Sequence, residues 1–191
     1  MNYHAFYIDN NLLIRIKDDE CHCFTKENNI SILYNNKEEV IGYNIFDYNF
    51  EGLNEGLVVL TRELHEDINK QLTSIKQDLL DFDDKDYFVV GYVKSIKKHQ
   101  KSDKLNICQV DIGSEVLQIV CGASNVAQDQ KVVVAKVGAV LFNGTWIHKG
   151  SLMNVESNGM ICSAKELNLV KESTGILVLE DNYKIGEPFV A

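Results

Sequence analysis

From Phe88 onward the chain is a series of short, β-branched runs at regular spacing, bounded by turn residues. The runs are "FVVGYVKSI", "LNICQVDIG", "EVLQIVCG", "KVVVAKVGAVL" and "GILVLE". In the second run Cys108, Val110 and Ile112 alternate with polar residues, and Gly113-Ser114 follows as a tight-turn signal. A series of this kind over roughly 100 residues favours a small closed β-barrel over a sandwich.

The first part of the chain has a different pattern. Strand-like runs, "HAFYI", "NLLIRI", "ISILYN" and "VIGYNIF", are separated by turns rich in Asn and Asp. After Thr61, a candidate N-cap, apolar residues recur every three or four positions, at Leu64, Ile68, Leu72, Ile75 and Leu79. This spacing predicts an amphipathic helix near 61–80, before the acidic segment "DFDDKD". We therefore predict an acidic α+β domain over 1–86 and an all-β domain over 87–191.

The charge of the chain is unevenly distributed. The net charge is −9, but residues 1–87 carry ten more acidic than basic side chains, whereas residues 88–191 carry one more basic than acidic. Five of the lysines in the second part crowd into "KSIKKHQKSDK", residues 94–104, together with His99. A local basic patch of this kind can attract a polyanion despite the overall negative charge, although such runs also occur on surfaces that bind nothing.

Composition points to a cytoplasmic protein with reduced thiols. No apolar run approaches the roughly 18 residues that a membrane span requires, and the first residues lack the pattern of a secretion signal. We therefore expect no membrane association. The five cysteines have no disulfide-framework spacing, which fits free thiols in the cytoplasm.

Candidate metal and catalytic residues do not form a recognisable site. Cys21 and Cys23 would share a strand face that His22 does not, and no second pair follows at zinc spacing. Cys121 and Cys162 are the serious nucleophile candidates, but no spacing places an imidazole beside either sulfur. We predict no metal, no cofactor and no catalytic residue.

Four blocks in the second part resemble a known family. They are "VVGYVKSIKKHQKSDKLNICQVDIG", "LQIVCGASNV", "VVVAKVGAVL" and "SNGMICSAKEL". In this order they are similar to the OB-fold tRNA-binding domain of bacterial phenylalanyl-tRNA synthetase β subunits and of stand-alone tRNA-binding proteins. Gln100 stands where that family usually has proline. The acidic first part is similar in arrangement to the extra domain of stand-alone bacterial members.

The resemblance implies a five-stranded OB-fold barrel that docks on structured tRNA. The positions that match the family's contacts are Lys98, Lys101, Lys104, Asn106, Asn125, Lys136, Ser157 and Met160. Lysines can neutralise phosphates, the amides and the hydroxyl can bond phosphate, 2′-hydroxyl or base edges, and methionine offers an apolar surface to a base. The small residues of "SNGM", with Gly159, would let RNA approach the backbone; a β-bulge that fills the barrel end is the alternative.

We therefore predict a non-catalytic, cytoplasmic tRNA-binding protein, too short to contain a synthetase catalytic module as well. A protein-binding or chaperone-like OB module is the main alternative, and an enzyme acting through Cys121 or Cys162 is a third. A homodimer and a protein partner for the N-terminal domain are further expectations.

Overall fold

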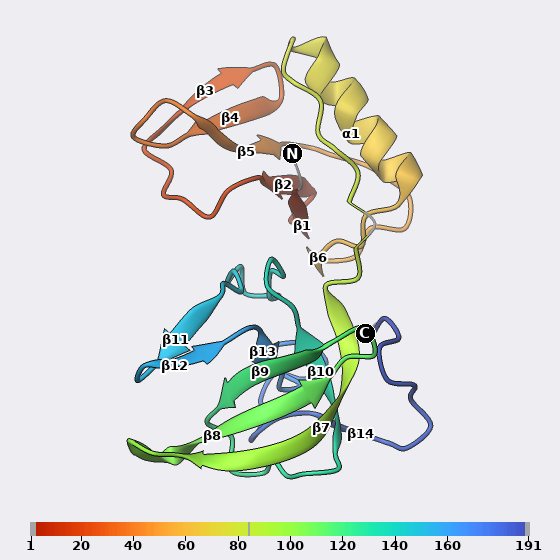
Figure 1. The fold of residues 1–191 in the computed structure, drawn as a ribbon. Helices are drawn as coiled ribbons and strands as arrows, with labels where there is room; N and C mark the ends of the chain where they lie inside the picture. The colour runs from red at the N-terminus through yellow and green to blue at the C-terminus, as the bar shows by residue number, and fades with distance from the viewer. Residues whose placement is uncertain (1–2, 84, 190–191) are drawn as a thin grey trace. The chain divides into compact units, whose positions relative to one another are not determined.

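A computed structural model describes residues 3–83 and 85–189. The chain divides into two compact units, residues 1–84 and 85–191, which are described separately below (Figure 1). Each unit is built mainly from antiparallel strands; the first has one buried apolar cluster and the second has two.

The first unit is a six-stranded antiparallel sheet with strand order β3-β4-β5-β2-β1-β6. Its strands are β1 (His4–Ile8), β2 (Asn11–Arg15), β3 (Cys23–Glu27), β4 (Ile30–Tyr34), β5 (Val40–Ile45) and β6 (Gly56–Leu57). Tight turns with residues at positive φ, such as Asp9-Asn10 and Asn28, connect the hairpins. These are positions at which Asn and Asp tolerate the left-handed conformation better than other side chains do.

One helix, α1 (Arg62–Ser74), accompanies this sheet. The hydroxyl of Thr61 caps it by accepting a hydrogen bond from the N–H of Leu64 at 3.2 Å. The helix ends because the chain turns back at Lys76, where φ is +57°, and the N–H groups of residues 75–77 bond to the last carbonyls. The helix is therefore shorter than the predicted 61–80.

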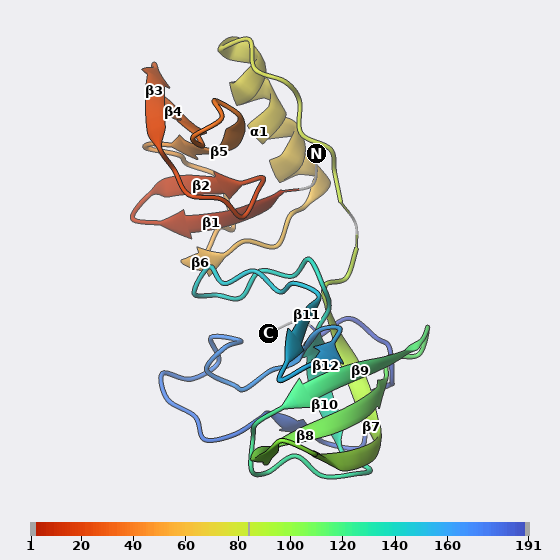
Figure 2. The ribbon, with the colours of Figure 1, turned by 60° about the vertical axis from the view of Figure 1, so that its left-hand side comes forward.

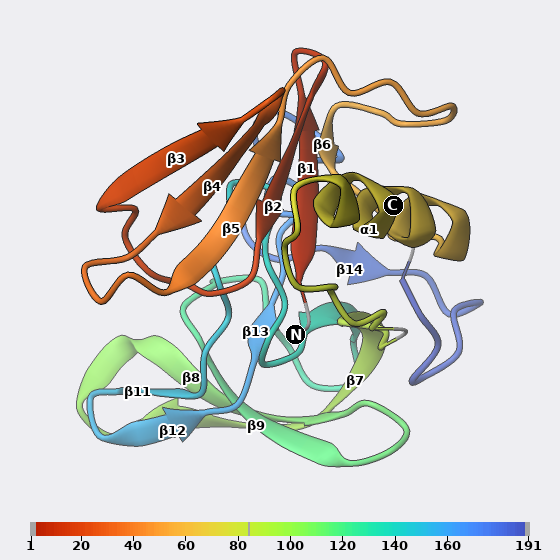
Figure 3. The same ribbon diagram turned by 90° about the horizontal axis from the view of Figure 1, so that it is seen from above.

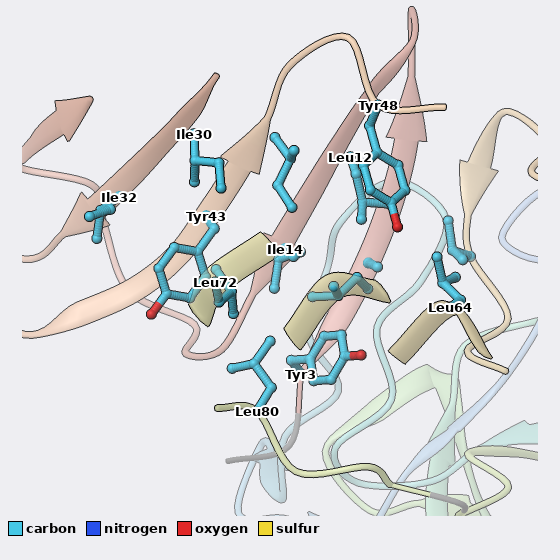
Figure 4. Close-up of a cluster of buried hydrophobic side chains, with 14 of the residues drawn as sticks. Tyr3, Leu12, Ile14, Ile30, Ile32, Tyr43, Tyr48, Leu64, Leu72 and Leu80 are labelled. Carbon is cyan, nitrogen blue, oxygen red and sulfur yellow. The ribbon is translucent and has the colours of Figure 1, made fainter. Parts of the chain in front are cut away.

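The core of the first unit lies between the sheet and the apolar face of α1 (Figure 4). Leu64, Ile68 and Leu72 of the helix belong to the same buried cluster as Leu12 and Ile14 of β2, and all five are fully buried. A face with apolar residues every three or four positions becomes stable as a helix only when it is covered in this way.

The second unit contains a strongly curved antiparallel sheet with the order β13-β10-β7-β8-β9, and β14 pairs with β10 as well (Figure 2). Its strands are β7 (Phe88–His99), β8 (Ser102–Asp111), β9 (Val116–Cys121), β10 (Lys131–Ala135), β13 (Met160–Ile161) and β14 (Val178–Leu179). A separate two-stranded hairpin is formed by β11 (Gly150–Leu152) and β12 (Val155–Ser157). The register of β7 against β8 shifts twice, between Val93 and Ser95 and between Lys98 and His99. Such bulges bend a strand.

This sheet does not close on itself. Its two end strands, β9 and β13, share no ladder; instead, isolated hydrogen bonds connect β9 to the segment 156–159. The N–H of Asn158 donates to the carbonyl of Gln118 at 2.8 Å, and the side-chain amide of Gln118 donates to the carbonyl of Glu156 at 2.9 Å. Gly159 has φ +134° and passes so close to β10 that a Cβ would lie 2.8 Å from the carbonyl oxygen of Ala135.

The predicted fold class is therefore wrong. In place of an α+β domain followed by a closed five-stranded OB barrel, the described residues form a nearly all-β chain with one 13-residue helix and several open antiparallel sheets. In the second unit the reason is the turn at Gly159, which breaks the strand between β12 and β13, so that no continuous ladder to β9 can form.

Candidate nucleic-acid interface

The lysine cluster folds into the β7–β8 hairpin. Lys98 lies opposite Asn106 near its end, and Gln100 and Lys101 form the connection between the strands. Lys98, Lys101 and Lys104 are exposed, and none of them has a carboxylate within ion-pair distance among the described residues. Lys94, at the other end of the cluster, pairs instead with Asp111 at 3.7 Å. The hairpin end therefore carries three lysine ammonium groups without an ion pair, together with one carboxylate, that of Asp103.

His99 belongs to the same sequence cluster but is buried, with 4% of its surface exposed. Its Nδ1 accepts a hydrogen bond from the backbone N–H of Lys101 at 3.0 Å, and its Nε2 lies 3.3 Å from the carbonyl oxygen of Leu152 in β11. Since Nδ1 accepts, Nε2 carries the proton and donates to Leu152. This imidazole thus fixes the lysine hairpin to the β11–β12 hairpin.

A groove of about 720 Å³ runs from the lysine hairpin to the loop after β9. Lys98, Lys104 and Asn106 line one side of it, and residues 122–124 and 126–128 line the other. Asp103 also lines it and brings one negative charge. Three of the predicted contact residues are thus brought together in one groove.

Asn106 is the most informative residue of this groove. Only 7% of its surface is exposed, and its side-chain amide has no hydrogen-bond partner among the described residues. Among the described residues no buried side-chain nitrogen or oxygen lacks a partner, so the amide atoms of Asn106 are open to the groove. Asn106 therefore offers both a donor and an acceptor to a molecule that enters the groove.

Asn125 organises the loop on the far side of the groove. Its Nδ2 donates to the carbonyl of Ile176 at 3.0 Å, and its Oδ1 accepts from the N–H of Ile176 at 2.9 Å. These two bonds hold the loop against residues 173–176. They also explain Gly175, because a Cβ at that position would collide with the Asn125 amide.

The remaining predicted contact residues, Ser157, Met160 and Lys136, lie outside the groove. Ser157 is buried and its hydroxyl bonds the protein backbone, accepting from the N–H of Val120 at 3.0 Å and donating to the carbonyl of Gly159 at 3.2 Å. Met160 is half-buried and lines a second depression of about 330 Å³, which shares Gly122 and Ala123 with the groove. Lys136 follows β10 and lines neither hollow.

The cysteines of the second unit lie in surroundings that disfavour the thiolate. Cys108, Cys121 and Cys162 are all buried. Burial raises the pKa of Cys108 and of Cys162 to about 12, and it raises the pKa of Cys121 as well. A nucleophilic cysteine needs the opposite shift, because only the thiolate attacks.

The part of the chain that the structure describes contains no candidate metal cluster and no candidate membrane-spanning helix. Within residues 3–83 and 85–189, no group of three or more His, Cys, Asp and Glu side chains is placed to hold a metal ion. In the same residues no helix is long and apolar enough to cross a membrane.

Comparison with known proteins decides the family. The model of the family described as "Putative tRNA binding domain" matches residues 88–188, which contain the lysine hairpin, the groove and the second depression. The chain belongs to this family. The resemblance recognised from the four sequence blocks is therefore confirmed.

Two relatives of this tRNA-binding-domain protein show how far the similarity extends. The "Putative tRNA-binding protein YtpR" of Bacillus subtilis is 44% identical over 97% of this chain and 98% of its own length. The phenylalanine-tRNA ligase beta subunit of Campylobacter jejuni is 52% identical over 54% of this chain, a match that spans 14% of that subunit. The relative of matching length is thus named as a tRNA-binding protein and not as an enzyme.

Among solved structures, the C-terminal domain of Plasmodium vivax p43 aligns with 57% of this chain and 63% of that domain, at 22% identity and a TM-score of 0.41. A score this low supports no inference about the fold.

Two features of this surface were not predicted from the sequence. His99 was counted with the lysines, although its ring points inward; nothing in the sequence distinguishes it from its neighbours. The β11–β12 hairpin was not predicted, yet Met153-Asn154 between two short runs is the position of a two-residue turn, for which Asn is a typical residue.

Proposed function

We propose that this protein binds folded tRNA through the second unit, with the lysine hairpin on the phosphate backbone and the groove beside it. The observation that carries the proposal is the setting of Asn106, whose side-chain amide makes no hydrogen bond among the described residues and lines one groove with Lys98 and Lys104, next to the single carboxylate of Asp103. A phosphate or a 2′-hydroxyl at that point would find two cations and a hydrogen-bonding amide together. This is the combination by which proteins recognise RNA backbone.

Each lysine that reaches a phosphate releases condensed counterions, so affinity should fall steeply as salt rises. Lys101, at the hairpin connection, extends the cationic surface, and Lys136 is assigned a more distant phosphate contact. Asn125 and Ser157 contribute indirectly, because their hydrogen bonds to the backbone of Ile176 and Val120 hold the loops of this surface in place. Met160 contributes an apolar side chain to the adjoining depression.

Recognition of tRNA shape is favoured over gripping of a single strand. Proteins that bind single strands stack successive bases on aromatic side chains. None of the eleven residues that line the groove is aromatic. The proposed ligand is therefore a folded RNA surface, and the proposed setting is the bacterial cytoplasm, where tRNA is found.

The test is a titration of fluorescently labelled bulk tRNA with the purified full-length protein at several salt concentrations. An unstructured RNA and an unfolded polypeptide serve as competitors. We expect tRNA binding that weakens steeply with salt and that the unstructured RNA displaces poorly. If the polypeptide competes and tRNA does not bind, the protein-binding alternative replaces this proposal. Sedimentation of the same samples gives the oligomeric state, for which a homodimer remains our expectation.

A further inference from the structure

The turn between β11 and β12 places a methionine, Met153, in the left-handed backbone conformation. In this hairpin Gly150 pairs with Ser157 and Leu152 pairs with Val155. Met153 and Asn154 therefore form a two-residue turn. Their φ angles are +47° and +71°. Turns of this class need positive φ at both positions and favour Asn, Asp and Gly. Asn154 suits this requirement, whereas the Cβ of Met153 is strained there.

Met153 stands out among the residues in this conformation. Ten non-glycine residues have positive φ in the part of the chain that the structure describes, and Met153 is the one apolar member; the others are Asp, Asn, Glu or Lys. Its side chain is also exposed, at 54%, next to Leu152 at 42%. A strained backbone that holds an apolar side chain in solvent indicates a role in binding rather than in folding.

The hairpin presents little net charge. Its flanking cation, Lys149, lies 3.9 Å from the carboxylate of Glu156 in β12, so these charges offset each other. What the end of the hairpin offers to a partner is therefore the apolar surface of Leu152 and Met153.

This apolar tip is attached to the lysine hairpin. Figure 3, like Figure 1, shows the ends of the β7–β8 and β11–β12 hairpins on the same side of the unit. His99 joins them, because its two nitrogens bond to Lys101 in one hairpin and to Leu152 in the other. A ligand that spans the lysines can therefore reach the tip without rearrangement of the protein.

We propose that Leu152 and Met153 form a second RNA contact, which packs against the uncovered face of a nucleobase in the tRNA whose phosphates lie on the lysine hairpin. The proposal rests on the tRNA binding proposed above. The methionine thioether is flexible and polarisable, and it packs well on aromatic rings. Every nucleobase has such a face, so the contact adds affinity without reading sequence. His99 is the positioning residue that sets the distance between the cationic and the apolar contacts.

The decisive variant is Met153→Asn. Asn suits positive φ better than Met, so the midpoint of thermal unfolding should stay the same or rise. Loss of the apolar contact should nevertheless weaken tRNA binding about 3- to 10-fold. The slope of affinity against salt should not change, since no phosphate contact is removed. Val116→Thr, at a site in β9 exposed to 46%, is the matched control and should leave the affinity unchanged.

A pair of His99 variants tests the positioning role. His99→Asn places an amide oxygen where Nδ1 accepts from Lys101 but loses the bond to Leu152, whereas His99→Gln keeps a donor near the position of Nε2. We expect His99→Asn to weaken tRNA binding about as much as Met153→Asn, with no further loss in the double variant, and His99→Gln to restore most of the affinity. A merely structural role would make the two single changes additive.

The outcomes separate this inference from the proposed function. If the unchanged protein shows no salt-dependent tRNA binding, both fail. If it binds tRNA and Met153→Asn binds equally well, only the nucleobase contact is overturned. A lower salt slope in Met153→Asn would also overturn it, because the tip would then act by supporting the lysines. A changed oligomeric state in Met153→Asn would assign the tip to contact with a second copy instead.

Discussion

The hydroxyl of Ser157 accepts a hydrogen bond from the backbone N–H of Val120 at 3.0 Å, across the line along which β9 lacks a partner strand. The same hydroxyl donates to the carbonyl of Gly159 at 3.2 Å. One small side chain thus takes the place of a ladder at the point where the sheet would have to close. A residue that the family resemblance matched to an RNA-contact position thus has a structural role within the fold.

Ser157→Ala should lower the free energy of unfolding by about 1–3 kcal/mol, because it leaves the N–H of Val120 without an acceptor in a buried position. Urea denaturation of the full-length protein measures the change. Ser151→Ala, at an exposed position in β11, is the control and should change stability by less than about 0.5 kcal/mol. Equal stabilities of the two variants would contradict the structural role of Ser157.

Lys101→Ala should reduce the slope of log affinity against log salt by about 0.7–0.9, the value expected for one lost phosphate contact. Lys98→Ala should behave in the same way. Lys94→Ala is the control from the same sequence cluster; its ammonium pairs with Asp111, so the slope should hardly change. The measurement is the tRNA titration at several salt concentrations. An equal effect at all three positions would show that only the overall charge matters.

Asn106→Leu should weaken tRNA binding while leaving the protein as stable as before. Among the described residues its amide makes no hydrogen bond, so a side chain of similar volume costs no internal bond. Loss of one or two bonds to the ligand corresponds to about 0.5–3 kcal/mol of binding free energy. Titration with tRNA and urea denaturation of the same variant distinguish this result from misfolding. Misfolding would lower both the tRNA affinity and the free energy of unfolding.

Thiol chemistry should divide the cysteines into two groups. At pH 8 we expect an aromatic disulfide reagent to label Cys21 and Cys23, which are exposed, and to leave the three buried cysteines unreacted until denaturant is added. Rapid labelling of Cys162 in the folded protein would contradict this and revive the nucleophile hypothesis.

The same burial makes stability depend on pH. The pKa of Cys108 and of Cys162 is raised to about 12, whereas a thiol in the unfolded chain ionises near 9. Below pH 9 both states are protonated and the full stability is present. As the pH rises from about 9 toward 12, the unfolded thiols lose protons that the folded ones keep, so the free energy of unfolding falls. Urea denaturation across this range measures the effect; Cys21→Ser should not alter it.

How much of the surface could be predicted from sequence depends on the kind of residue. The cluster that contains Lys98, Lys101 and Lys104 could be recognised because charge density is a local property of a run of residues. Only the structure places Lys98 in β7, Lys104 in β8 and Lys101 in the connection between them. Asn106 was named for its matching position, but its lack of a partner depends on which atoms surround it. The inward orientation of His99 depends on Leu152, which lies 53 positions away in the chain.

The sequence by itself determined the local structure and the family. Alternating runs produced β7, β8 and β9, the spacing of Leu64, Ile68 and Leu72 produced α1, and four motif blocks identified the tRNA-binding domain. Only the tertiary structure decided whether the sheet closed and which side chains line the groove. Closure requires two strands distant in sequence to run in register over several residues, and the turn at Gly159 prevents it, so that Ser157 bridges the gap. Such long-range geometry has no local signature, because it arises from packing and not from the preferences of neighbouring residues.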